Sequence, residues 1–440
     1  ELEPKTRNKM MHDTLILCCH EGVKETKQAF GNLFSQVDYL CKAHGIKVAD
    51  KIAIQTMRRH SNSQEPLSSE DLKYDARALA IFISAVFGVD VPHELNVLIP
   101  HTNRPYQKGL EINNRRIRCI VKNWDSDFIR VDIDQDADEE EYLVQLKDEE
   151  NHIDHTYLWD ILKEGMQLNL LDCQVKQPVI TPRLIVVEPD YLVDISSIAT
   201  CFTAFGHHPL LYLLNQMKPR ANTQATLLGN FAGAALDDII NTNGKYQMNE
   251  TIKTNFREKA LEFCTCPWFD AKKFYTDANQ QAFNLQQVVD ILFPRTASQA
   301  QMSAFRGESL YDRKKAILEP SFVCEALGIQ GRVDLMTTDC KLLVEQKSGR
   351  NMNIETHQVD PGYHSYQLEP HYVQLLLYYG VLQHNFKLSN DRVNIRLLYS
   401  KYQPQDGLMV VAYYQKLFKE AIEYRNQLVA ASFEIAKEGF

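Results

Sequence analysis

The strongest constraint on how this chain can fold lies between residues 331 and 350, where GRVDLMTTDCKLLVEQKSGR places charged residues inside apolar, strand-like segments. Asp334 opens the first segment, DLM, and Glu345 and Lys347 lie in the second, LLVEQK. Burying an unpaired charge costs several kcal/mol, so a fold retains such residues only where they are paired, bound to a metal, or both. The stretch therefore predicts a strand hairpin built around a charged site.

The size and composition of the chain narrow its class. With 440 residues it is too long for one hydrophobic core, which predicts two or three domains. Apolar residues make up 44% and charged residues 24% of the sequence, as in ordinary globular proteins. No apolar run reaches the ~18 residues that a membrane span requires, so we expect no membrane partner.

The cysteines predict a cellular location, and the start of the chain predicts that it is part of a longer protein. Ten cysteines are scattered without the spacing of a small disulfide scaffold, which favours a reducing, cytoplasmic location. The chain begins at Glu1 without a signal-peptide pattern, which is typical of a piece trimmed from a longer protein.

The net charge of −9 does not argue against a nucleic-acid partner, because one segment accounts for all of it. Residues 131–150, VDIDQDADEEEYLVQLKDEE, hold ten acids and one lysine, which is a charge of −9, so the rest of the chain is neutral. Such a run is usually a solvated loop or strand edge, and acidic mimicry of DNA is the weaker alternative.

Residues 1–105 have a helical pattern. Apolar residues recur at three- and four-residue spacing over 24–44 and again over 71–89, and SSED at 68–71 resembles a helix start. The cluster QTMRRH at 55–60 could touch phosphate, but a solvated helix face is the more common use of such residues. We predict a small helical domain whose role the sequence does not indicate.

Residues 106–190 change to the alternating pattern of half-buried strands. RRIRCIVKNW, FIRVDID and EYLVQL are followed by a short helix and further strands. This order fits a small β-barrel of the oligonucleotide-binding (OB) type, with an SH3-like barrel as the competing interpretation. Trp124, Phe128 and Tyr142 are either stacking platforms for bases or, more commonly, packing residues.

Residues 191–440 combine helices and strands. ATLLGNFAGAALDDII and HYVQLLLYYGVL read as helices, RLLYSK and GLMVVAYY as strands, and KLFKEAIEYRNQLVAASFEIAK as a long closing helix. With the hairpin at 331–350 between them, these elements predict an α/β core with a mixed sheet flanked by helices.

The hairpin residues have the chemistry of a metal site. Ten residues separate Asp334 from Glu345, enough for a turn to bring both carboxylates together, and such hard oxygen ligands suit Mg²⁺ or Mn²⁺. Lys347 lies on the same strand face as Glu345 and could assist a metal-bound water or the attacked phosphate. Gln374 and Tyr378 follow at helical i, i+4 spacing. A buried salt bridge on a hairpin is the alternative.

These motifs resemble a known family. GRVDLM, VEQKSGR and QLLLY are similar to the GxxD, (D/E)xK and QxxxY motifs of the RecB-like branch of the PD-(D/E)XK nucleases. VVEPDYLVDISSIATCF and EYRNQLVA resemble segments that flank this domain in the replication nuclease-helicases that process DNA flaps, of which the chain would be a bacterial-type relative. The resemblance covers about residues 188–431. It implies a nuclease with an α/β core that acts in DNA replication or repair.

The resemblance also implies roles for single residues. Asp334, Glu345 and the backbone carbonyl of Gln346 would hold Mg²⁺ or Mn²⁺, and Lys347 would be the catalytic lysine. The side chains that would hold the site and the DNA backbone are Gln374, Tyr378 and Arg350. The implied substrate is DNA with a single-stranded end or a flap, and a helicase domain would follow Phe440.

Two departures from the family pattern affect these expectations. Cys201 occupies the first position of the family's four-cysteine iron–sulfur site, but no cysteine follows Cys340, so we expect no cluster, and CTC at 264–266 reads as reduced thiols. The family's helical metal-binding histidine falls on Gly233. Asp237, one turn later, either substitutes for it or is a solvated acid.

Three functions therefore remain open. The first is the metal-dependent deoxyribonuclease. The second is a degenerate nuclease fold that binds DNA as a scaffold for a helicase without cutting it. The third and weakest is an RNA-processing enzyme, because the motifs do not distinguish the two sugars.

Overall fold

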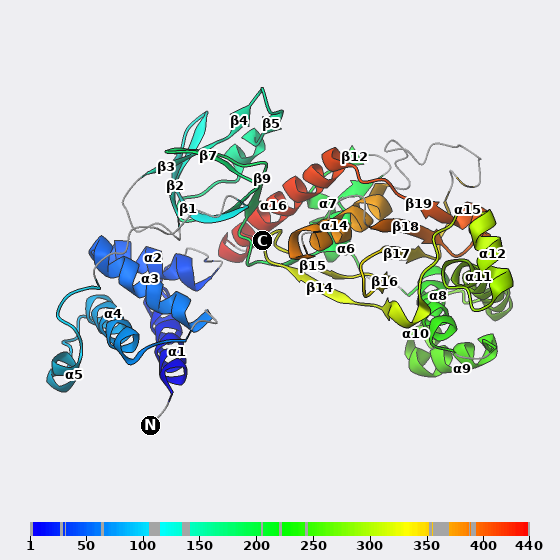
Figure 1. The fold of residues 1–440 in the computed structure, drawn as a ribbon, viewed down its shortest axis with the longest axis horizontal. Coiled ribbons are helices and arrows are strands. Elements are labelled where there is room, and N and C mark those ends of the chain that lie inside the picture. The colour runs from blue at the N-terminus through cyan, green and yellow to red at the C-terminus, as the bar shows by residue number, and fades with distance from the viewer. Residues whose placement is uncertain are drawn as a thin grey trace. The chain divides into compact units, whose positions relative to one another are not determined.

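The computed structural model describes residues 3–26, 30, 32–62, 66–104, 115–133, 141–203, 206–219, 222–242, 245–351, 354, 369–386, 388 and 393–438. The chain forms two compact units (Figure 1). Unit 1 contains Glu1–Tyr191 together with Val429–Phe440, and unit 2 contains Leu192–Leu428. Unit 2 begins one residue after position 191, where the predicted α/β part of the chain begins.

The first part of unit 1 is helical, as predicted. Its helices are α1 (Pro4–Gly22), α2 (Leu33–Ala43), α3 (Val48–Asn62), α4 (Ser69–Phe87) and α5 (His93–Leu98). The predicted helix start at SSED is confirmed, because Ser68 and Asp71 form a reciprocal capping box before α4. The predicted helix over 24–44 is wrong at its beginning: α1 ends at Gly22, a turn follows, and α2 begins only at Leu33, after its N-cap Asn32.

The cluster at 55–60 has a structural role inside this helical part. Gln55 is buried and donates from Nε2 to the carbonyl oxygen of Phe34 at 3.1 Å. The Arg58 guanidinium lies 5.1 Å from the centre of the Phe34 ring. His60 Nδ1 lies 2.9 Å from Oδ1 of the buried Asp75. These contacts bind α3 to its neighbours, so the predicted solvated face is only partly correct.

The second part of unit 1 is a seven-stranded sheet with the order β7-β8-β3-β2-β1-β6-β9. The pairing of β3 with β8 is parallel and the other pairings are antiparallel. Residues 134–140 of the acidic run lie outside the described residues. The strands and the short helix of this part are β1 (Arg116–Trp124), β2 (Phe128–Ile133), β3 (Tyr142–Gln145), β4 (Lys147–Asp148), β5 (Ile153–Asp154), the 3-10 helix η1 (Thr156–Asp160), β6 (Gln167–Leu171), β7 (Gln174–Lys176), β8 (Val179–Thr181) and β9 (Leu184–Val187).

The three aromatic residues proposed as stacking platforms are placed differently from one another. Tyr142 is 2% exposed and belongs to the core of the sheet, and Trp124 packs against that core. Phe128 is half-buried at the start of β2. Packing is therefore the role that the structure gives to Tyr142 and Trp124.

Unit 2 is built on a five-stranded mixed sheet with the order β13-β16-β17-β18-β19. Only β17 and β18 run parallel; the other pairs are antiparallel. The predicted mixed α/β arrangement is confirmed. The strands are β13 (Ala316–Leu318), β16 (Leu335–Thr337), β17 (Leu342–Lys347), β18 (Asn394–Tyr399) and β19 (Leu408–Val410).

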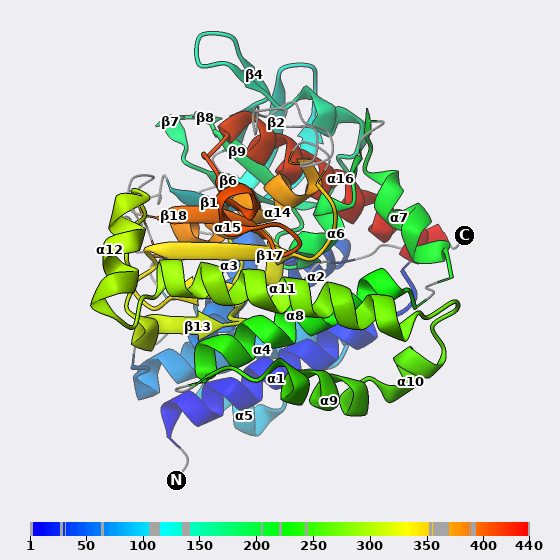
Figure 2. The same cartoon turned by 90° about the vertical axis from the view of Figure 1, so that its right-hand side faces the viewer.

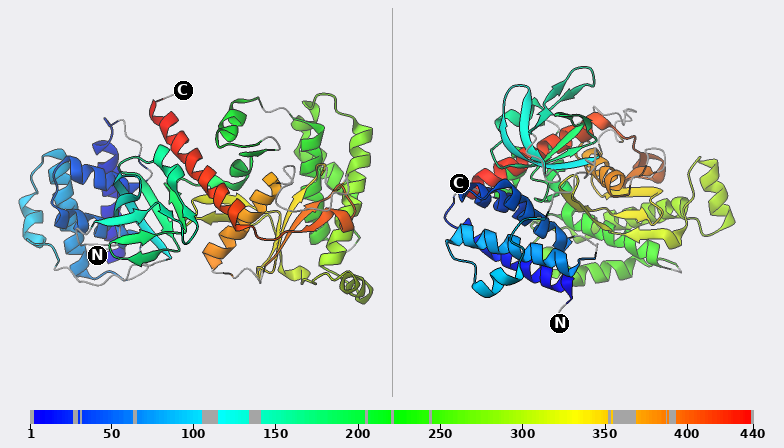
Figure 3. Two further views of the ribbon diagram at one scale, coloured as in Figure 1. Left: turned by 90° about the horizontal axis from the view of Figure 1, so that it is seen from above. Right: turned by 60° about the vertical axis from the view of Figure 1, so that its left-hand side comes forward.

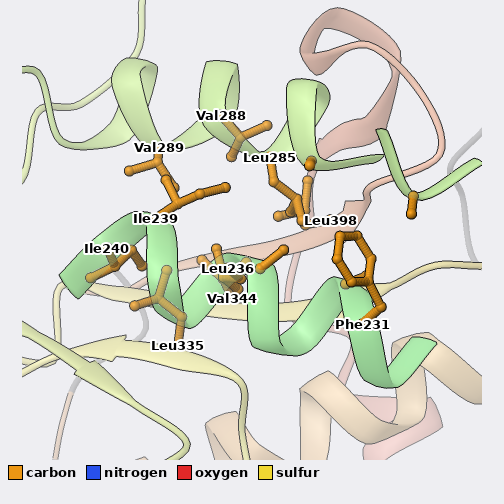
Figure 4. Close-up of a cluster of buried hydrophobic side chains, with 14 of the residues drawn as sticks. Phe231, Leu236, Ile239, Ile240, Leu285, Val288, Val289, Leu335, Val344 and Leu398 are labelled. Atoms are coloured by element: carbon orange, nitrogen blue, oxygen red, sulfur yellow. The ribbon is translucent and has the colours of Figure 1, made fainter. Parts of the chain in front are cut away.

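Helices cover both faces of this sheet (Figures 2 and 3). On one face lie α8 (Gln224–Asn241) and α11 (Ala271–Leu292), whose apolar side chains form one buried cluster with those of the sheet (Figure 4). Leu335, Val344 and Leu398 supply the strand side of that cluster. On the other face lies α14 (Glu369–Phe386), which is apolar almost all round because α16 (Gln415–Glu438) covers it in turn at Phe418.

Further elements belong to the described part of unit 2. A second sheet has the order β10-β15-β14 and leads into the charged hairpin. The remaining elements are β10 (Val193–Asp194), α6 (Ile195–Ala199), β11 (Phe202–Thr203), β12 (Gly206–His207), α7 (Leu210–Met217), α9 (Met248–Glu258), α10 (Ala260–Cys264), α12 (Ala297–Phe305), η2 (Arg313–Lys315), β14 (Ser321–Cys324), β15 (Ile329–Arg332) and α15 (Pro404–Gly407). Within the described part of the chain, no helix has both the length and the apolar character needed to cross a membrane.

Two helical glycines provide a matched stability test. A methyl group on Gly380 of α14 would lie 2.4 Å from Cε2 of the buried Phe418, whereas at Gly233 of α8 no heavy atom of the described residues lies within 4 Å. We expect Gly380→Ala to lower the free energy of unfolding by about 1–3 kcal/mol because α14 and α16 must separate. Gly233→Ala should leave it unchanged or raise it by up to about 1 kcal/mol, because alanine favours a helix. Urea denaturation measures both, and equal effects would contradict the packing at Gly380.

Candidate active site

The predicted carboxylates come together at the hairpin of β16 and β17. The antiparallel register pairs Leu335 with Val344. Asp334 and Glu345 are therefore opposite each other, one residue further from the turn. Asp334 lies in a bend directly before β16 rather than inside a strand, which corrects the sequence interpretation. Glu345 lies within β17 and is 3% exposed.

Alternation along β17 separates the site from the core. Val344 and Gln346 face α8 and α11, while Glu345 and Lys347 face α14. Lys347 Nζ donates to Glu345 Oε1 at 2.8 Å and to Gln374 Oε1 at 2.9 Å. Gln374 Nε2 donates to the same Glu345 oxygen at 2.6 Å. The three side chains therefore form a closed hydrogen-bonded triangle between β17 and α14.

Tyr378, one helical turn after Gln374, connects α14 to the segment before Asp334. Its hydroxyl donates to the carbonyl oxygen of Arg332 at 2.6 Å, just before Asp334. Burial, with a contribution from the Glu345 charge, raises the pKa of Tyr378 above its ordinary range, so the phenol keeps its proton. A Cβ on Gly331 would lie 2.9 Å from Cε1 of the Tyr378 ring, so this close approach requires glycine.

Burial dominates the electrostatics of the carboxylate pair. It raises the pKa of Glu345 to about 7, with a further increase from the Asp334 charge and an opposing effect from Lys347. Burial also raises the pKa of Asp334, although the Gln346 backbone N–H, 2.5 Å from Oδ2, opposes this. Glu345 Oε2 is buried and has no hydrogen-bond partner among the described residues. The site thus holds a carboxylate oxygen that is free to bind another group.

Asp237 on α8 belongs to the same electrostatic environment. Burial raises its pKa to about 7, and the next largest contributions come from Glu319 and Asp334. Glu319 is bound to this region because its backbone N–H donates to the Asp334 carbonyl at 2.9 Å and its side chain pairs with Arg332 at 3.0 Å. Asp237 is therefore half-buried near these charges rather than fully solvated.

Gly229, Gly233 and Asp237 lie on one face of α8 because they are spaced four residues apart. A Cβ on Gly229 would lie 3.2 Å from Ser348 Oγ, which places the first turns of this face beside the end of β17. No heavy atom of the described residues lies within 4 Å of a Cβ built on Gly233. The position that the sequence resemblance aligns with a metal-binding histidine therefore supplies no ligand, but the described residues leave room for one.

A buried polar network supports the site from the other face of the sheet. Gln346 Nε2 donates to Ser400 Oγ at 2.7 Å, and Ser400 Oγ donates to Gln281 Oε1 at 2.7 Å. Gln281 Nε2 donates to the Ser348 carbonyl at 3.1 Å, and Asn284 Nδ2 to the Ser400 carbonyl at 3.0 Å. These bonds connect α11 to the carboxyl ends of the parallel strands β17 and β18 and hold the Gln346 side chain.

His371 and Arg350 lie at the margin of the site. His371, one helical turn before Gln374, has Nδ1 2.6 Å from the Tyr399 hydroxyl. Burial, reinforced by the charge of Lys347, lowers the pKa of His371 to about 4, so the imidazole is neutral at physiological pH. Arg350 is exposed, three residues after Lys347.

Sequence reasoning did not identify Glu319, His371, Gln281 or Ser400. The helical spacing from Gln374 could have indicated His371, since residues three apart share a face. The other three come from separate elements with no motif of their own, so only the fold brings them to the hairpin.

The three cysteines singled out in the sequence are free thiols. Cys201 is buried, and burial raises the pKa of its thiol to about 12. Cys266 is buried and Cys264 is exposed, and both are free thiols.

The donor set is compatible with a hard divalent cation. Asp334, Glu345 and the Gln346 carbonyl offer oxygen atoms, which Mg²⁺ and Mn²⁺ prefer, and the unpartnered Glu345 oxygen provides a free ligand. Across the described ranges, no three His, Cys, Asp or Glu side chains lie close enough to form a complete metal site. The carboxylate pair is therefore the centre of the candidate site, and Asp237 lies beyond it.

Replacing Glu345 with glutamine should stabilise the protein in a pH-dependent way. The ordinary pKa of 4.5 applies in the unfolded chain and about 7 in the folded one, so folding stability falls as the pH rises from 4.5 to 7. The loss is on the order of 3 kcal/mol and is complete above pH 7. Glutamine has no ionisable carboxyl group, so Glu345→Gln does not show this loss. The free energy of unfolding of the variant should equal that of the wild type at pH 4 and exceed it by the full amount at pH 8. Denaturant unfolding at both pH values checks this, with the exposed Glu250→Gln as control. Greater wild-type stability at pH 8 would contradict it.

Comparison with known proteins does not assign the chain to a family. No protein-family model matches the sequence, and no curated protein matches it.

Proposed function

We propose that unit 2 is a metal-dependent deoxyribonuclease that hydrolyses phosphodiester bonds of single-stranded ends or flaps in DNA replication or repair. The observation that carries the proposal is the buried Glu345 oxygen without a partner, beside Asp334. The raised pKa values of both carboxyls show that two negative charges at this position are costly to bury unless a cation offsets them. A structural salt bridge would satisfy both oxygens with donors, whereas a cation site leaves one of them available.

The proposed cofactor is Mg²⁺ or Mn²⁺. Asp334, Glu345 and the Gln346 carbonyl would hold it, and Asp237 is the further candidate ligand. When bound, such an ion would activate water and neutralise charge on the attacked phosphate. The network through Ser400 and Gln281 would keep the Gln346 side chain in place.

In the proposed reaction, the oxygen of a water molecule forms a bond to phosphorus, one bridging P–O bond breaks, and the departing oxygen takes up a proton. The Lys347 ammonium lies 2.8 Å from Glu345 Oε1, and a hydrogen bond to Gln374 holds it there. Lys347 would donate a hydrogen bond to the negative charge that develops on the phosphate. Tyr378 would hold the turn before Asp334, and Arg350 would contact a neighbouring phosphate.

A DNA-binding scaffold without catalysis is the second candidate. The observation that favours it is Gly233, because glycine supplies no ligand where the family has a histidine. The motifs fit RNA hydrolysis as well, but no described contact favours it.

We also propose that β1–β9 form a small OB-type barrel that would bind the single strand. The support is that β8 and β9 are separated only by Pro182 and Arg183, yet β8 pairs with β3 and β9 pairs with β6. Since β3 and β6 stand on opposite sides of β2 and β1, one continuous segment reaches both edges. The parallel pairing of β3 with β8 and the intervening short helix η1 agree with this topology.

Removing the proposed catalytic groups should abolish cutting. We expect Glu345→Ala and Lys347→Ala each to lower the cleavage rate of a labelled linear single strand about 10²- to 10⁴-fold in Mg²⁺ or Mn²⁺. Lys253→Ala is the matched control, because Lys253 is an exposed lysine paired with Glu250 and should have no effect. Gel electrophoresis of the products measures the rates. Absence of wild-type cleavage would refute the nuclease, and equal cleavage of closed single-stranded circles would refute the requirement for an end.

Calorimetric titration with Mn²⁺ tests the ligands separately from catalysis. Asp334→Ala should abolish binding heat, and Asp237→Ala should weaken binding severalfold. Asp238→Ala is the control, since Asp238 Oδ2 accepts a hydrogen bond from Thr251 instead of facing the site. Gly233→His should tighten binding, because the new imidazole enters open space between Gly229 and Asp237. No heat from the wild type at millimolar metal would favour the scaffold.

A further inference from the structure

Trp268 is the most exposed of the large apolar side chains that the structure describes. It is 97% exposed, in the turn between α10 and α11. Its backbone is left-handed, with φ of +57°, a conformation that is unfavourable for a bulky side chain. The indole therefore adds neither packing nor a favourable backbone preference to the fold. Because Trp268 does not stabilise the fold in either way, we expect it to have a role in binding.

The turn that presents Trp268 is fixed on both sides. The next residue, Phe269, packs into an aromatic cluster, with ring centres 5.4 Å from Phe263 and 5.5 Å from Phe274. Asn222 Nδ2 donates to Thr265 Oγ1 at 2.9 Å. The indole consequently projects from a firmly held backbone, which limits the ordering cost of any contact it makes.

The fixed turn also lies beside the helix that leads to the candidate site. The Asp270 backbone N–H donates at 2.8 Å to the side-chain oxygen of Gln224, the first residue of α8. Five residues later, roughly 8 Å along the helix, Gly229 adjoins Ser348, which follows Lys347. The glycine-lined face of α8 therefore connects the turn to the carboxylate pair.

Positive charge accompanies the ring. Lys272 and Lys273 lie in the first turn of α11 and are exposed. Neither ammonium group is in an ion pair with any residue that the structure describes. An exposed aromatic ring followed four and five residues later by exposed lysines is a combination suited to single-stranded nucleic acid, since the ring stacks on a base and the lysines meet the phosphates.

We propose that Trp268, Lys272 and Lys273 form a binding platform for a single strand, which stacks one base on the indole and directs the adjoining strand along α8 towards Glu345. The choice of nucleic acid as ligand rests on the proposed function. A duplex would not bind in this way, because its bases are already stacked on one another.

The test uses fluorescence of the full chain in EDTA, where metal-dependent cutting cannot occur. The chain has three tryptophans, so Trp124→Phe combined with Trp159→Phe leaves Trp268 as the only reporter. Adding a short oligo(dT) should quench its emission. In the wild-type background, Trp268→Ala should weaken oligo(dT) binding about tenfold, measured by anisotropy of a labelled strand. Trp268→Phe should retain most of the affinity. Leu261→Ala, a change at another exposed apolar residue (79%), is the control.

The lysines are tested by salt dependence. Lys272→Ala and Lys273→Ala should each make the affinity fall less steeply with increasing salt. Each variant lacks one phosphate contact, so fewer counterions are released when the strand binds. Unchanged affinity in Trp268→Ala, or absence of quenching, overturns the proposal and leaves the turn as a candidate for protein docking.

These outcomes are distinguishable from failure of the proposed nuclease activity. Quenching without cleavage in Mg²⁺ would keep the platform and reject the enzyme, whereas cleavage with no effect of Trp268→Ala would do the reverse.

Discussion

The burial of Glu345 next to Asp334 is the constraint on which the arrangement of unit 2 depends. A carboxylate that is 3% exposed must receive donors from its surroundings, and here they come from Lys347 on the same strand and Gln374 on α14. That requirement fixes how α14 is oriented over the sheet and which of its faces carries polar groups. The remaining oxygen of Glu345 has no such donor among the described residues, so the structure satisfies the charge only in part.

One strand serves two environments because side chains alternate along it. The positions of β17 that face α8 and α11 include Val344 in the apolar cluster, while the opposite positions carry the acid and the lysine. Gln346 lies between Glu345 and Lys347 but on the opposite face of the strand, and its side-chain amide donates into a buried network with Ser400 and Gln281. A buried network of this kind is rigid when all of its members are satisfied. The precision of the site thus depends on residues of α11 that face away from it.

Local sequence patterns predicted the parts of the fold where periodicity and chemistry agree. The helix at α8, the hairpin strands, α14 and α16 follow from apolar spacing, and the meeting of Asp334 with Glu345 follows from the length of the turn. Patterns failed where tertiary context decides. The helix expected from residue 24 begins at Leu33 in the structure, and Asp334 lies just outside its strand. Glu319 and Ser400 reach the site from segments that carry no motif, so their roles depend on chain topology that a single sequence does not reveal.

The close approach of Gly331 to Tyr378 has an evolutionary consequence. These residues are far apart in the sequence, yet the tyrosine ring occupies the space that any side chain at position 331 would need. The tyrosine also carries the hydroxyl that holds the chain before Asp334. A residue larger than glycine at position 331 therefore requires a residue smaller than tyrosine at position 378. Such a smaller residue would lack the hydroxyl group that holds the chain. Among relatives of this chain, the two positions should covary as one inherited unit, and separate changes should be rare.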